Sequence, residues 1–122
     1  MKRLKMFIDT ICANAIADFY KIAHPTMYPL GTELVYSTWT PRASRMKGVN
    51  KVVAAGFQVF FKKLNTVFYN NFFSKSKEEV VSHYKRLIGK TLGDPNPDTS
   101  RIEKLHDLGY LPLEVKALPE GT

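Results

Sequence analysis

The stretch Gly109–Thr122, GYLPLEVKALPEGT, decides the fold class expected for this chain. Apolar and charged residues alternate from Leu113 to Ala117, which is the period-two pattern of a strand with one buried face. Pro119–Gly121 follows with the composition of a turn. A strand that leads into a turn normally continues into another strand. The ending therefore predicts sheet structure and indicates the edge of something larger.

A second strand is predicted at Thr32–Thr40, TELVYSTWT, because the stretch is rich in β-branched and aromatic residues. Its alternation is not clean. Leu34 and Tyr36 would point to one side, whereas Val35 and Trp39 would point to the other. A strand that is apolar on both faces needs cover on both sides, which is a large demand on a short chain.

Helical patterns fill most of the remaining chain. The first covers roughly Lys5–His24 and ends at Pro25 and Pro29. From Lys51 to Leu64 the apolar spacing is again helical, and a short aromatic helix is expected over Asn65–Phe73. The apolar stripe expected on the Lys51–Leu64 helix consists of Val53, Phe57, Phe60 and Leu64.

Two capping boxes predict where the last helices begin. Ser76 with Glu79 opens one helix, and Ser100 with Glu103 opens the next, which ends at Gly109. The residues expected to face inward on the first of them are Val80, Tyr84, Leu87 and Ile88. The order of helix, strand, several helices and strand predicts an α+β fold, with several helices packed on a small sheet.

Length and composition indicate one small domain. The chain has 122 residues, 44% of them hydrophobic, which is too apolar for a disordered chain. Its net charge of +7 favours phosphate-bearing partners. Solvated helix faces account for such a charge equally well, so the charge alone does not indicate a nucleic-acid partner, and none is expected. Seven aromatic residues between Phe57 and Phe73 are better explained by a core or a subunit interface than by base stacking.

The N-terminal residues favour a cytoplasmic protein. The basic start resembles a signal peptide, but Asp9 and Asn14 interrupt its apolar stretch. No apolar run is long enough to span a bilayer, so no membrane partner is expected. Cys12 is the only cysteine and cannot form an internal disulfide.

No motif for a catalytic centre is complete. The phosphate-binding patterns GxxxxGK[ST] and GxGxxG are absent. The histidines at 24, 83 and 106 are far apart and have no carboxylate or cysteine at ligand spacing, so no metal site is predicted. His83 and His106 are interpreted as structural. Taken alone, the residues describe an α+β module without its own catalytic residues.

Three stretches together resemble the N-terminal domain of the nicotinamide phosphoribosyltransferase family: Asp18–Arg42, Gly56–Phe61 and Gly109–Thr122. The last is the most specific, because the family has a G-x-L-P-hydrophobic-E-hydrophobic-K-A-hydrophobic-P-E-G run there. Nicotinate phosphoribosyltransferases share the D-x-Y-K start and a similar ending but match the middle less well. Residues 1–122 are expected to form one domain, with 18–122 family-like and 1–17 a poorly matched leader.

The resemblance implies that this is the N-terminal domain of a type II phosphoribosyltransferase without its α/β barrel. In the family, the strand that ends in P-E-G leads into further β-structure and then into the barrel. The chain is therefore expected to be a fragment, a truncated product or one half of a split enzyme. The catalytic histidine of the family belongs to the barrel, so His24 is not assigned that role, and this chain alone is expected to be inactive.

The resemblance also implies a substrate-binding role for Tyr20, Asp18 and Arg42. In the head-to-tail homodimers of the family, the residue matching Tyr20 stacks on the nicotinamide ring. Asp18 either lies near that pocket or simply caps a helix. Arg42 matches an arginine that approaches the phosphates of phosphoribosyl pyrophosphate, and Lys21 is a second cation or a solvated lysine.

The implied reaction converts nicotinamide and phosphoribosyl pyrophosphate into nicotinamide mononucleotide and pyrophosphate, with Mg²⁺ on the phosphates. The implied partners are the barrel domain or a partner subunit, in a homo-oligomer. A nicotinate phosphoribosyltransferase fragment and a non-catalytic, self-associating remnant remain as alternatives.

Overall fold

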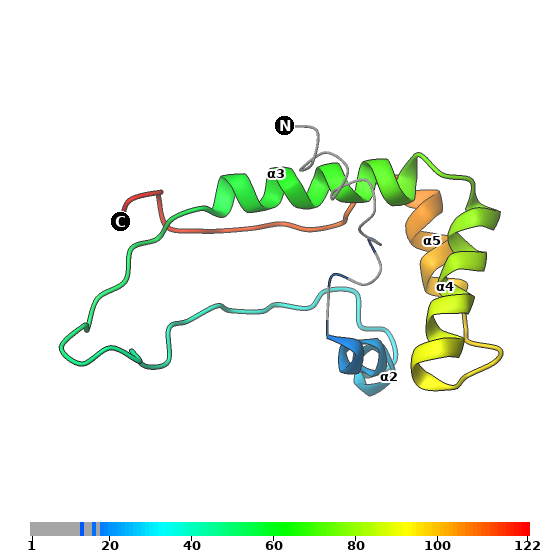
Figure 1. Ribbon diagram of the computed structural model, residues 1–122, viewed down its shortest axis with the longest axis horizontal. Helices are drawn as coiled ribbons and strands as arrows, with labels where there is room; N and C mark the ends of the chain where they lie inside the picture. The colour runs from blue at the N-terminus through cyan, green and yellow to red at the C-terminus, as the bar shows by residue number, and fades with distance from the viewer. Residues whose placement is uncertain (1–12, 14–15, 17) are drawn as a thin grey trace.

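The computed structural model describes residues 13, 16 and 18–122. Most of the helix expected over Lys5–His24, Cys12, the signal-peptide-like start and nearly all of the expected leader lie outside these residues. The helical elements are η2 (Phe19–Ala23, a 3₁₀ helix), α2 (His24–Met27), α3 (Phe57–Phe68), η3 (Tyr69–Phe73, a π-helical turn), α4 (Lys77–Leu92) and α5 (Ser100–Leu108), as Figure 1 shows.

The predicted α+β fold is wrong, because no strand occurs among the described residues. Both predicted strands, Thr32–Thr40 and Leu113–Ala117, run as long open segments in Figure 1. Alternation sets only the direction of side chains, whereas a strand also needs a hydrogen-bonded neighbour about 4.8 Å away. Neither segment has such a neighbour within the described part of the chain, and both leave apolar side chains in solvent: Leu34 is 84% exposed and Leu113 is 61% exposed.

The core lies at the far end of α3, where η3, α4 and α5 meet (Figure 1). Its buried members are Ala13, Val67, Phe72 and Val80, and Phe72 is only 1% exposed. Partly buried side chains packed around them are Phe68, Phe73, Ile102 and Leu105. Phe72 and Phe73 meet edge to face with ring centroids 5.0 Å apart, a favourable arrangement for aromatic rings.

The helix expected from Lys51 to Leu64 begins later, at Phe57. Gly56 precedes it in the left-handed region with φ of 85°, which interrupts helical geometry at this point. The aromatic stretch is not a separate helix either. Instead, α3 continues to Phe68 and widens into η3, where the Ser74 N–H donates to the Tyr69 carbonyl at 2.9 Å, five residues back.

The start of α4 confirms the first predicted capping box. The Ser76 hydroxyl oxygen accepts a hydrogen bond from the Glu79 N–H at 3.2 Å, and the helix ends at Gly93 with φ of 73°. The predicted inward face is also confirmed, since Val80 and Ile88 are buried. The other two inward positions, Tyr84 and Leu87, are partly buried.

The second predicted capping box, Ser100 with Glu103, is wrong, because the N-cap residue of α5 is Thr99 and its side chain makes no capping hydrogen bond. Thr99 holds the N-cap position of α5, and its hydroxyl donates to the Glu103 carboxylate at 2.6 Å. Asp98 accepts hydrogen bonds from both the N–H (2.9 Å) and the hydroxyl (3.1 Å) of Ser100. These bonds lower the pKa of Asp98, the backbone N–H bond being the larger cause. The predicted end at Gly109 is confirmed by its φ of 76°.

Polar contacts hold α5 against the start of α4. The Nε2 atom of His106 lies 2.8 Å from the Lys75 carbonyl oxygen, and the His106 ring packs on Phe72. Lys77 forms an ion pair with Asp107, whose hydrogen bond raises the pKa of Lys77. The structural role predicted for His106 is thereby confirmed. None of the helices in the described part of the chain is long and apolar enough to cross a membrane.

The C-terminal segment runs beside α3 in Figure 1 and returns to the start of that helix. The predicted turn at Pro119–Gly121 is confirmed, because the Thr122 N–H donates to the Pro119 carbonyl at 3.2 Å and Gly121 has φ of 89°. Positive φ at the third position is the mark of a type II turn. The turn places the last residues beside Ala54, before α3 begins.

Candidate substrate-binding site

The first candidate residues lie at the short helix η2. Asp18 occupies its N-cap position with an extended backbone, and the Asp18 carbonyl accepts the Lys21 N–H at 2.9 Å. The Asp18 side chain, however, makes no capping hydrogen bond. The interpretation of Asp18 as a simple side-chain N-cap is therefore not supported. Its carboxylate accepts no hydrogen bond from the first amides of η2.

Tyr20 is not a core residue, since it is 61% exposed. The rings of Tyr20 and His24 meet edge to face, with centroids 5.4 Å apart. The ammonium of Lys21 lies 5.0 Å from the ring centroid, a cation–π contact that the sequence reasoning missed. Tyr20 thus presents an aromatic surface next to a positive charge, in an otherwise open position.

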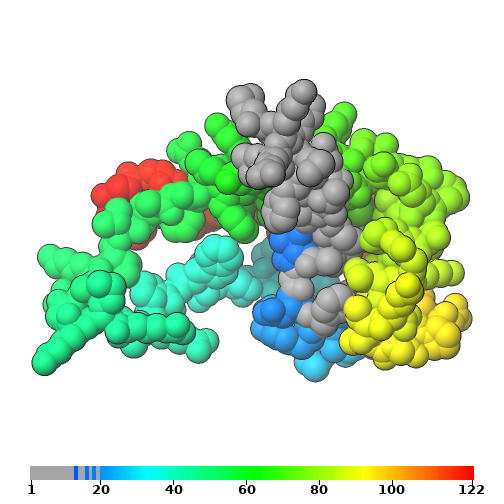
Figure 2. Space-filling model, in the orientation of Figure 1, coloured from blue at the N-terminus to red at the C-terminus, as the bar shows by residue number. Residues whose placement is uncertain are grey.

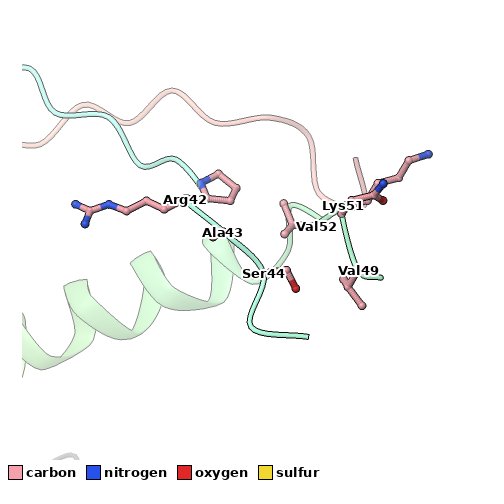
Figure 3. Close-up of a pocket in the computed structure, with 8 residues that line it drawn as sticks. Arg42, Ala43, Ser44, Val49, Lys51 and Val52 are labelled. Atoms are coloured by element: carbon pink, nitrogen blue, oxygen red, sulfur yellow. The ribbon is translucent and has the colours of Figure 1, made fainter. Parts of the chain in front are cut away.

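Arg42 lies in an exposed loop after the long open segment that begins near Thr32. Together with its neighbours it lines an open cavity of about 370 Å³ (Figure 3). The lining residues are Pro41, Arg42, Ala43, Ser44, Val49, Asn50, Lys51 and Val52. Figure 3 shows the side chains of Arg42 and Lys51 pointing in opposite directions, so the two cations do not converge on one ligand.

The structure brings Asp18 and Tyr20 together on one element but does not bring Arg42 to them. In Figure 1, η2 and the loop that carries Arg42 lie at opposite ends of the open segment. Figure 2 shows this loop as an arm that projects from the helical body. The predicted substrate-binding residues therefore form two separate groups within one chain.

The open segment is attached to α3 by an aromatic contact close to Arg42. The rings of Trp39 and Phe60 meet edge to face, with centroids 6.2 Å apart. Both side chains remain substantially exposed, Trp39 at 76% and Phe60 at 46%. This contact joins the segment to α3 just before the Arg42 loop begins.

Sequence reasoning also missed Glu120. Its carboxylate accepts the backbone N–H groups of Gly56 at 2.7 Å and Gln58 at 3.1 Å. These bonds hold the pKa of Glu120 below its usual value, with the Gln58 amide the largest cause. One signal was available: α3 has no side-chain cap and no acidic residue in its first turn, so its first amides required a partner from elsewhere.

No group of three or more histidine, cysteine, aspartate or glutamate side chains that could hold a metal ion occurs among the described residues. Most of the carboxylates described above accept hydrogen bonds from backbone amides or a hydroxyl, or pair with a lysine, whereas the Asp18 carboxylate makes no capping bond. The candidate site thus consists of an aromatic ring, a carboxylate and an arginine.

Comparisons with known proteins identify the family. A family model described as nicotinamide phosphoribosyltransferase, N-terminal domain, matches residues 13–93, a range that includes all three candidate residues. The chain is also 48% identical over 115 residues to a nicotinamide phosphoribosyltransferase from Acinetobacter baylyi. That alignment covers 89% of this chain and 23% of the relative. No solved structure matches the chain.

The match over most of the chain defines a phosphoribosyltransferase domain. More specifically, the chain belongs to the nicotinamide phosphoribosyltransferase family and contains the N-terminal domain of that family. It spans about a quarter of the length of the relative that it matches.

Proposed function

We propose that this chain takes part in the synthesis of nicotinamide mononucleotide and pyrophosphate from nicotinamide and phosphoribosyl pyrophosphate, a salvage step of NAD synthesis in the cytoplasm. The observation that carries the proposal is the 48% identity to a nicotinamide phosphoribosyltransferase. Because the chain covers 23% of that relative, we propose that it works with a barrel domain or a partner subunit in a homo-oligomer.

In this proposal, Tyr20 holds the flat nicotinamide ring by stacking. Its exposed ring, at 61%, supports the assignment, because a buried core tyrosine would have no face to offer. Such stacking contributes about 0.5–1.5 kcal/mol beyond area burial. Asp18, which makes no capping bond, is proposed to orient the carboxamide of the same ligand.

Arg42 is proposed to bind the phosphates of phosphoribosyl pyrophosphate. Its planar guanidinium matches phosphate oxygens with paired hydrogen bonds and stabilises the negative charge that grows on departing pyrophosphate. Arg42 and Tyr20 lie at opposite ends of the open segment, so we infer that they act on one substrate pair only when further protein completes the site (Figure 1).

The exposed apolar side chains of the open segments support an assembly of this kind. Leu34, Tyr36 and Trp39 are each at least 76% exposed, and Leu118 is 65% exposed. So many large apolar side chains left in solvent are unusual for a protein that works as a free monomer. We propose that these segments are covered in the working enzyme.

Mg²⁺ is proposed to accompany phosphoribosyl pyrophosphate and to neutralise part of its phosphate charge. The described residues form no cluster suited to holding a metal, so no residue of this chain is assigned to it. What the chain itself contributes is positioning of the ring and of the phosphates.

A complementation assay tests the proposal. This chain is mixed with a separately expressed barrel domain from the same source, and nicotinamide mononucleotide formation is measured. Activity is expected only on mixing, and Tyr20→Ala is expected to lower it about tenfold through loss of stacking. The control is Tyr69→Ala, which removes a 66%-exposed tyrosine from η3 and leaves η2 untouched.

Two results would contradict the proposal. Absence of activity with a correctly folded barrel would leave only common ancestry with the family. Equal losses in the Tyr20→Ala and Tyr69→Ala variants would remove Tyr20 from the site. A third result, product formation by this chain alone, would overturn the inference that a partner is required.

A further inference from the structure

The turn at Pro119–Thr122 makes a set of contacts that the proposed function does not use. Its backbone pairs with Ala54: the Ala54 N–H donates to the Thr122 carbonyl at 2.7 Å, and the Gly121 N–H donates to the Ala54 carbonyl at 2.8 Å. In this pairing two residues of the turn oppose one residue of the other segment, with the glycine at positive φ, as in a β-bulge.

The Glu120 side chain extends the same contact onto α3. Its two carboxylate oxygens accept separate backbone N–H groups, Gly56 at 2.7 Å and Gln58 at 3.1 Å. These are among the first amides of a helix whose own residues provide no side-chain cap. A carboxylate at this position satisfies two donors and also interacts favourably with the positive end of the helix dipole.

We propose that Glu120 is a positioning residue that clamps the C-terminal segment to the start of α3, and that the clamp opens when its carboxylate is protonated. The clamp joins positions 56 and 120, and therefore closes the chain from α3 through α5 into a loop. This inference does not depend on the proposed function, because it concerns contacts within one chain.

The surroundings of Glu120 agree with a clamp made by backbone amides. The residues in contact with the turn, Ala54, Gly56 and Gln58, are uncharged, and no charged residue occurs from Val52 to Phe61. The nearest cations along that stretch are Lys51 and Lys62. On its own segment, the nearest charged residues are Lys116 and Glu114, which pair with each other at 3.5 Å.

The sign of the pH effect follows from these contacts. Hydrogen bonds from Gln58, then Gly56 and Phe57, lower the pKa of Glu120, while desolvation opposes them. A group with a lowered pKa stabilises the folded contact above its ordinary pKa and loses that contribution as the pH falls through the lowered value. The clamp is therefore closed at neutral pH and opens in acid.

Amide NMR of the full 122-residue chain tests the clamp. The amide protons of Gly56 and Gln58 are followed from neutral to acidic pH. Both are expected to shift together, with a midpoint below the usual glutamate range. Glu120→Gln removes the charge, so it should abolish this titration and speed hydrogen exchange at both amides several-fold. The amide of Val80 in the core should not respond.

The matched control is Glu114→Gln, which removes a glutamate from the same segment whose side chain is 82% exposed. It should leave the titration at Gly56 and Gln58 unchanged. Glu120→Asp retains the charge on a shorter side chain and should restore the titration in part. The proposal is overturned if the wild-type amides do not titrate, or if they titrate equally in the Glu120→Gln chain.

Discussion

The two halves of this molecule differ in how their conformation is specified. The helical half, from the end of α3 through α5, contains the core around Phe72 and Val80, and its helices carry their own stop and start signals. The open half, with the segments around Leu34 and Leu113, has extended backbone and exposed apolar side chains. Helices satisfy their hydrogen bonds within one segment, whereas a strand requires a neighbouring segment, and neither open segment pairs as a strand among the described residues.

Hydrogen exchange gives the largest expected contrast between the halves. Amides in the middle of α4, near Val80 and Ile88, should exchange on the order of a thousandfold more slowly than amides of Thr32–Thr40, because only α4 is hydrogen-bonded and packed on the core. The measurement is residue-resolved exchange by NMR or mass spectrometry. Equal protection in both segments would mean that Thr32–Thr40 has found a partner, for instance a second copy of the chain.

Truncation of Phe72 should cause the largest loss of stability. Phe72→Ala removes the most buried large side chain and is expected to lower the free energy of unfolding by about 3–5 kcal/mol. Urea denaturation followed by circular dichroism measures the change. The matched aromatic truncation in the open half is Tyr36→Ala, where the side chain is 84% exposed, and it should change stability by about 0.5 kcal/mol or less. Similar losses in both variants would remove the distinction between the halves.

A smaller effect is expected at the start of α4. Ser76→Ala removes the hydroxyl that accepts the Glu79 N–H, and it should cost about 1 kcal/mol of stability. Ser82→Ala is the control, because this exposed serine lies inside the same helix, where alanine is the better helix former. The control should be neutral or slightly stabilising. If Ser76→Ala is also neutral, the helix start is fixed by packing rather than by its cap.

The same contrast explains how much of the fold was predictable. The capping serine at 76, the inward positions Val80 and Ile88, and the terminal Gly109 depend on contacts within a few residues, and each was predicted from sequence. The start of α3 was placed too early, at Lys51, because the helical apolar spacing already includes Val53, before Gly56. The sheet was predicted wrongly, since an alternating pattern indicates a capacity to pair and does not supply the partner.

The candidate site divides in the same way. The positions of Tyr20, Asp18 and Arg42 came from a resemblance to the family, and the match over residues 13–93 supports that family. Spacing alone would not have selected them, because an exposed tyrosine and an exposed arginine have no distinctive local pattern. The Glu120 contact joins positions 64 residues apart, so no local pattern could place it.

The wide turn at Tyr69–Phe73 has a consequence for how this domain tolerates insertions and deletions. Its bond from Ser74 to Tyr69 spans five residues instead of the four of an α-helix, so the turn contains one residue more than an α-helix would need. Loss of a single residue here would restore α-helical geometry, and because the wide turn already accommodates that extra residue, the chain that follows would keep nearly the same direction relative to α3. The wide turn is therefore a position at which this domain is expected to tolerate a one-residue deletion, whereas a deletion inside the regular part of α3 would rotate the residues after it by about 100°.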